Sequence, residues 1–182
     1  MINSVQKVIA DVSKKCLDNK ISFKLINRRL VDIHNLPCSG YFDEDSLVVA
    51  TNKKNSICWV STLLHESCHM DQFLQKSKYY VSDIIGLDVV EGWIAKRDMS
   101  ENKLLKGFYN TIGLELDCEK RTVRKIKKYK LPINIEKYIQ EANAYLFAYV
   151  YSLLSRKWYE APYEKKNIVN HMPTKFLTID KY

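Results

Sequence analysis

The stretch LLHESCHMDQF (residues 63–73) sets His65 and His69 four residues apart. Around it, from about 56–75, apolar residues recur with the period of a helix, and the β-branched run LVVAT (47–51) precedes this segment behind a polar turn. On an α-helix, side chains four residues apart project from the same face, one turn apart. The chain therefore has to form a helix that buries one side, presents two imidazoles on another and follows a strand.

The sequence of 182 residues predicts more helix than strand overall. It has only five Gly and four Pro, and a low content of these helix-breaking residues favours helix. Steps of three and four between apolar residues predict helices, and alternation predicts strands. We expect one domain over 1–182 of the α+β class, with a small β-sheet before the motif helix and a helical bundle after it. The expected elements are a helix at 4–18, strands at 21–26, 30–36 and 47–51, the helix at 56–75, a helix within 81–97 interrupted at Gly86 and Gly92, one long or broken helix over 103–130, a helix capped by Asn134, and an irregular tail from Trp158 to Tyr182.

Charge and cysteine content bear on which partners the protein could bind and in which compartment it is found. The net charge is +8, and the run KRTVRKIKKYK (120–130) carries seven cations without an acid. We interpret this run mainly as a solvated helix face, with binding of nucleic acid as the less favoured alternative. The five cysteines are scattered and odd in number, and we expect no export signal and no membrane span, so the sequence predicts a protein of the cytoplasm.

The histidine pair is the part of the sequence that carries chemistry. Two imidazoles one turn apart can hold one Zn²⁺, and Glu66, about 100° further round the helix, can reach a water molecule beside the metal. Leu64 and Cys68 are expected in the core, so Cys68 is not expected to be a ligand. The competing interpretation is a polar helix face with two histidines and no metal.

These residues also carry a resemblance to a known family. HESCH, after a strand, resembles the motif of the zincin superfamily of metallopeptidases, and more narrowly of minimal gluzincins, in which a downstream Glu is the third ligand. With LELDCEKR (114–121) and YIQEANAYLFAY (138–149), the chain is also similar to small bacteriophage proteins classed as metallopeptidases. The resemblance implies a zincin-like fold, a Zn²⁺ cofactor and, for a phage protein, the host cytoplasm.

A third zinc ligand has to come from later in the chain. The next histidine after His69 is His171, too far for the short spacing of metzincins, so a carboxylate is favoured. Glu115, 46 residues after His69, is the preferred candidate. Glu119 follows four residues later as a supporting acid or as the ligand itself, in which case Glu115 or Asp117 would support it.

Two further acids, Glu91 and Glu141, are candidates for the same role. Glu91 has the spacing of thermolysin-like gluzincins, but Ala95 stands where the supporting acid would be, and Gly92 weakens that helix. Glu141 is disfavoured because Ile139 occupies the position that a ligand would take in the resembling motif.

The resulting hypothesis is a zinc metallopeptidase that cuts a peptide or protein substrate, with Glu66 as general base. Tyr138, Tyr145 and His171 are candidates for stabilising the oxyanion, and Asn143 is a candidate for facing the site. The alternatives are a zinc amidohydrolase of a non-peptide substrate and a regulatory protein that binds nucleic acid through residues 120–130.

Overall fold

The computed structural model describes residues 2–33, 36–52, 56–81 and 86–182. It is helix-rich with a small mixed sheet, which confirms the α+β prediction. The chain divides into two compact units, one made of residues 1–75 and 121–133 and the other of residues 76–120 and 134–182. The expectation of a single domain stays a prediction.

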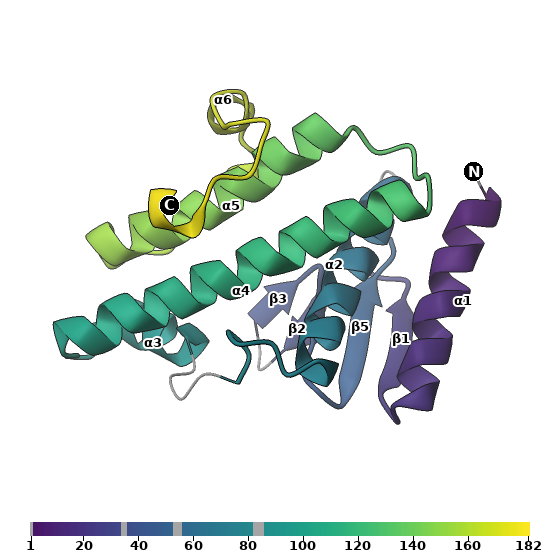
Figure 1. Cartoon of the computed structure of the whole chain (residues 1–182), viewed down its shortest axis with the longest axis horizontal. Coiled ribbons are helices and arrows are strands. Elements are labelled where there is room, and N and C mark those ends of the chain that lie inside the picture. Colours follow the sequence, from purple (N-terminus) through teal and green to yellow (C-terminus); the bar gives the residue numbers. More distant parts are fainter. Residues whose placement is uncertain (1, 34–35, 53–55, 82–85) are drawn as a thin grey trace. The chain divides into compact units, whose positions relative to one another are not determined.

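The first unit is built on a three-stranded sheet in the order β1-β5-β4. Two of its strands, β1 and β5, are labelled in Figure 1. Strands β1 (Ser22–Ile26) and β5 (Ser46–Ala50) run parallel and confirm the predicted strands at 21–26 and 47–51. Strand β4 (Gly40–Phe42) runs antiparallel to β5 and forms an edge. The apolar residues of β5 are buried, as expected of a middle strand.

Two short strands replace the single strand expected at 30–36. Strands β2 (Val31–Ile33) and β3 (Leu36–Cys38) pair antiparallel, with Asp32 opposite Pro37. Residues 34 and 35 of the predicted strand lie outside the described part of the chain. A three-residue strand opposite a proline is too short for its alternation to be recognised in the sequence.

The sequence pattern does not predict strand β4, which has three residues and begins with a glycine, a residue type that weakens strands. A Cβ atom at Gly40 would lie 2.9 Å from the Thr62 Cγ2 atom and 3.0 Å from the Val48 carbonyl oxygen. Glycine is therefore required at this position by the close approach of the strand to its neighbours rather than by a turn.

The motif helix α2 (Ser56–Leu74) packs on strands β4 and β5, and helix α1 (Ile2–Asp18) completes the core of the unit. These helices confirm the predictions at 56–75 and 4–18. The expected core positions Leu64 and Cys68 are fully buried. The other fully buried apolar side chains of the two helices are Val8, Cys16, Val60, Leu63 and Met70.

Helix α4 (Glu101–Lys128) is one uninterrupted helix, and its last two turns belong to the first unit. Within that unit, Lys125 bonds to Asp71 and Ser67, and Thr122 bonds to Cys68, so these turns are attached to the motif helix. Part of the basic run is therefore paired and not simply solvated.

The second unit is helical. It contains α3 (Gly86–Ile94), residues 101–120 of α4, α5 (Ile135–Ser155), and a tail with η1 (Pro162–Glu164), α6 (Lys166–Val169) and η2 (Ile179–Lys181). Its core joins residues of α3, α4 and α5, namely Val89, Val90, Leu104, Phe108, Ile112, Leu116, Leu146 and Tyr149. Short elements in the tail agree with the expected irregular structure.

Two details of this unit bear on the predictions. Asn134 caps α5 as expected, because its side-chain oxygen accepts a 3.0 Å hydrogen bond from the Lys137 backbone N–H. Gly92 does not interrupt the helix expected within 81–97, since α3 continues through it, and Gly86 is the first residue of α3. Residues 82–85 of that prediction lie outside the described residues.

None of the described helices is both long and apolar enough to cross a membrane.

Candidate metal centre on the motif helix

The imidazole Nε2 atoms of His65 and His69 point toward one another. Their Nε2 atoms are 3.1 Å apart, and the rings meet edge to face with centroids 4.7 Å apart. Two Zn–N bonds of about 2.1 Å at a tetrahedral angle would place the nitrogens about 3.4 Å apart. The pair thus has almost the spacing of two ligands on one ion and could hold a metal.

The inner nitrogen of His69 is held by Gln72. The His69 Nδ1 atom lies 2.9 Å from the Gln72 Oε1 atom, and the Gln72 side chain is fully buried. An amide oxygen can only accept, so Nδ1 carries the proton and Nε2 keeps its lone pair. Gln72 thus fixes the tautomer that a metal ligand needs. The sequence reasoning missed this residue, although its spacing of three from His69 was a usable signal.

Glu66, the predicted base, is on the same helix and only 9% exposed. Its negative charge affects the pKa of Cys38 on β3. Burial raises the pKa of the Cys38 thiol, and the negative charge of Glu66 raises it further.

Edge strand β4 flanks the turns of α2 that carry the histidines. Gly40 lies against Thr62, before these turns, and the Phe42 ring is 5.8 Å from that of Phe73, after them. Among the described strands, β4 pairs only with β5. Its outer edge offers backbone hydrogen-bonding groups beside the motif helix.

An ion cluster holds the end of the motif helix. The Asp71 carboxylate lies 2.5 Å from the Lys15 ammonium and 2.8 Å from that of Lys125. Burial by itself would raise the pKa of Asp71, but the charges and hydrogen bonds of Lys125 and Lys15 bring it below its ordinary value. Asp71 therefore stays ionised and ties α2 to both α1 and the end of α4.

The two favoured carboxylates belong to the second unit, where they face tyrosines. Glu119 is 6% exposed, and one of its oxygens accepts a 2.5 Å hydrogen bond from the Tyr138 hydroxyl. Glu115 is half-buried. Burial raises the pKa of Tyr145 and Tyr149 well above the ordinary range, and the nearby negative charge of Glu115 adds to this. These tyrosines stay protonated, and their hydroxyls lie 2.8 Å apart.

The remaining predicted residues of this unit are dispersed. Glu91 is exposed on α3, and Glu141, disfavoured as a ligand, lies within 3.8 Å of the Lys137 ammonium. His171 is exposed, with its Nδ1 atom 2.7 Å from the Asn167 carbonyl oxygen.

Asn143 is engaged with the tail. Its amide donates to the carbonyl oxygens of Pro173 and Lys175, at 2.8 and 3.1 Å, and its oxygen accepts from the Tyr182 hydroxyl. These bonds give Asn143 a structural role in place of the expected one at the site. Its partners come from a tail without periodic structure, so they could not be predicted.

No family model, no curated protein and no solved structure matches this chain. The resemblance to zincins consequently stays a prediction based on the motif residues. Inference about function has to start from the geometry of the two histidines.

Proposed function

We propose that the protein is a zinc-dependent, zincin-like metallopeptidase whose metal is held by His65 and His69. The observation that carries this proposal is the approach of their two Nε2 atoms to 3.1 Å, together with the Gln72 contact that leaves the Nε2 lone pair of His69 available. A helix face with two unrelated histidines would not require this orientation of either ring.

Glu66 acts as the general base. It follows His65 directly and is almost fully buried, which keeps its carboxylate out of bulk water. Zn²⁺ bound at the site would lower the pKa of a water molecule and polarise the substrate carbonyl. Glu66 accepts the proton of the attacking water and then donates it to the departing amine.

For the third ligand we propose a residue of α4. Within the first unit, Thr122 of this helix donates a 3.5 Å hydrogen bond to the sulfur of Cys68, next to His69. On a continuous helix, Cys118 lies about 40° from Thr122 in angle, Glu115 about 20° and Glu119 about 60°, so all three share its face.

Cys118 was not considered as a ligand from sequence. Its side chain is fully buried, and its thiol is a potential metal ligand. Thiolate is a common ligand of zinc, so Cys118 now stands beside Glu115 and Glu119 as a candidate. Glu91 is the weakest candidate, because it is exposed on α3.

A peptide substrate is supported by the edge of β4. An extended chain could add to this edge through backbone hydrogen bonds, which would place it beside the turns of α2 that carry the histidines. We propose the cytoplasm as the location, since none of the five cysteines forms a disulfide.

Metal content and peptide hydrolysis test the proposal together. Purified protein, reloaded with zinc and desalted, should retain about one ion per chain by mass spectrometry. His65→Ala and His69→Ala should lose it, whereas Glu66→Gln should keep it and lose a factor of about 10² to 10⁴ in the cleavage rate of a fluorogenic peptide library.

The third ligand is tested by a matched set, Glu115→Gln, Cys118→Ala and Glu119→Gln. The ligand is the residue whose change releases zinc while the other two variants keep it. Absence of stoichiometric zinc in the wild-type protein would overturn the metal site. Full cleavage by Glu66→Gln would overturn the role of the base.

A further inference from the structure

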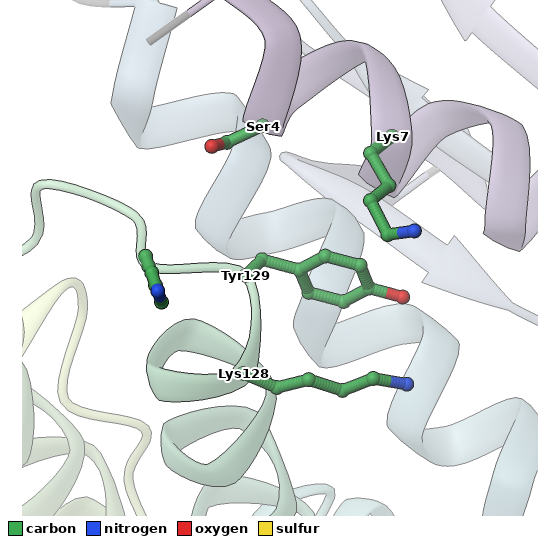
Figure 2. A pocket seen from close by; sticks show the side chains of 5 residues that line it. Ser4, Lys7, Lys128 and Tyr129 are labelled. Atoms are coloured by element: carbon green, nitrogen blue, oxygen red, sulfur yellow. The ribbon is translucent and has the colours of Figure 1, made fainter.

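A hollow lies on the first unit where α1 faces the last residue of α4 and the two residues that follow it, and no motif residue lines it (Figure 2). This open hollow has a volume of about 360 Å³ and is lined by Ser4, Lys7, Lys128, Tyr129 and Lys130. This volume falls within the range of small-ligand sites, about 300 to 1,000 Å³. None of these five residues takes part in the proposed hydrolysis.

The hollow carries an excess of positive charge. Within the part of the chain that the structure describes, Lys7, Lys128 and Lys130 form no ion pair. Two carboxylates act on the tyrosine in this hollow. That of Asp11 accepts a 2.9 Å hydrogen bond from the Tyr129 hydroxyl, and that of Asp71 is already paired with Lys15 and Lys125. Three unpaired ammonium groups beside two engaged carboxylates leave a net attraction for anions.

Side chains in the hollow are arranged around an aromatic ring. In Figure 2 the side chains of Lys7 and Lys128 extend on either side of Tyr129, with both ammonium groups at the same end as the tyrosine hydroxyl. The Lys128 ammonium lies 5.3 Å from the centroid of this ring. Cations beside a ring are the combination with which proteins bind single-stranded nucleic acid, where phosphates meet the charges and bases stack on the ring.

Positive charge continues beyond the hollow along α4. Arg124 lies one turn before Lys128, and Lys127 directly precedes it; both are exposed, and within the described residues neither forms an ion pair. A single phosphate would not need cations over this length, whereas the backbone of a polymer would.

We propose that this surface, consisting of the hollow and the adjoining cations Arg124 and Lys127, binds single-stranded nucleic acid. Lys7, Lys128 and Lys130 contact consecutive phosphates, and the Tyr129 ring supports a base. This function is separate from hydrolysis and does not depend on bound zinc.

Fluorescence anisotropy with a labelled oligothymidine of about 12 nucleotides tests the proposal. Wild-type protein should bind with an affinity that falls as salt rises from about 0.05 to 0.5 M. The triple variant Lys7→Gln, Lys128→Gln, Lys130→Gln should bind at least about tenfold more weakly, with a salt slope smaller by about two, since each lost contact to a single strand removes about 0.7.

A matched triple variant separates this site from the general charge of the protein. Lys103→Gln, Lys106→Gln, Lys157→Gln removes the same charge from exposed positions of the second unit and should bind like wild type. Equal losses in both triple variants, or no binding at low salt, would overturn the site. Stronger binding to anionic lipid vesicles or to a DNA duplex than to the oligonucleotide would overturn the choice of ligand.

The ring is tested separately from the charges. Tyr129→Phe keeps the ring and should bind like wild type, whereas Tyr129→Leu should weaken binding about fivefold or more. Equal affinity of these two variants would exclude stacking. Zinc content should be unchanged in every variant, so failure of this proposal is distinguishable from failure of the proposed hydrolase.

Discussion

The Lys125 ammonium lies 2.8 Å from the Asp71 carboxylate and 2.8 Å from the Ser67 hydroxyl, and these two partners flank His69 on the motif helix. Lys125 is 22% exposed and Asp71 is 13% exposed, so water screens this pair only in part. Lys125, 54 residues after Asp71 in the sequence, therefore stabilises the helical turn that carries His69.

Replacement of Lys125 by Met should destabilise the protein. The change leaves Asp71 with Lys15 as its remaining cation, and we expect a loss of about 1 to 2 kcal/mol, between the values for exposed and buried pairs. Urea unfolding measures it. Lys127→Met, at an exposed position of the same helix, is the control and should lie within about 0.5 kcal/mol of wild type.

The contribution of Asp71 should depend on pH in one direction. Its pKa in the folded protein lies below the ordinary value of 3.8, so its stabilising effect is complete above that value and is lost as pH falls through the lowered pKa. The difference in unfolding free energy between wild type and Asp71→Asn should therefore be constant from about pH 5 to 7 and shrink below about pH 4. A difference that grows on acidification would contradict the ionised, paired state of Asp71.

Gln72 should control zinc affinity without binding the metal. Gln72→Leu removes the acceptor at His69 Nδ1 and should weaken zinc binding about 10- to 100-fold, measured by competition with a chelating dye. Gln72→Glu keeps an acceptor of the same shape and should retain the affinity. If Leu and Glu behaved alike, the contact would have no role in fixing the tautomer.

The close approach of β4 to α2 should be sensitive to a single methyl group. Gly40→Ala adds a Cβ atom 2.9 Å from the Thr62 Cγ2 atom, and we expect a loss of about 1 to 3 kcal/mol from overpacking. Thr62→Ser removes that atom, so the double variant should recover part of the loss in urea unfolding. Additive losses would mean that the Val48 carbonyl, 3.0 Å away, is the obstacle.

Local patterns in the sequence were sufficient for much of the fold. The helix around His65 and His69, the strand at 47–51 and the Asn134 cap depend on residues within a few positions of each other, and all three are confirmed. That His65 and His69 share one helix face follows from the same local geometry, but the rotation of each ring does not.

Contacts between distant residues could not be predicted. Strand β4 exists because Gly40 fits against Thr62, and the attachment of Asn143 to the tail depends on where Pro173 and Lys175 lie in space. The sequence also does not reveal that Lys125 pairs with Asp71, because any of several cations in the basic run could have done so.

Because α4 has no break, the angular position of its acidic and thiol side chains is coupled to its anchoring at Thr122 and Lys125. One residue inserted between Cys118 and Thr122 would turn the earlier part of the helix by about 100° about its axis, whereas four inserted residues would nearly restore it, to within about 40°. The number of residues between Thr122 and the ligand candidates therefore determines the angle at which these candidates project from the helix, and the identity of the intervening residues has less effect on it.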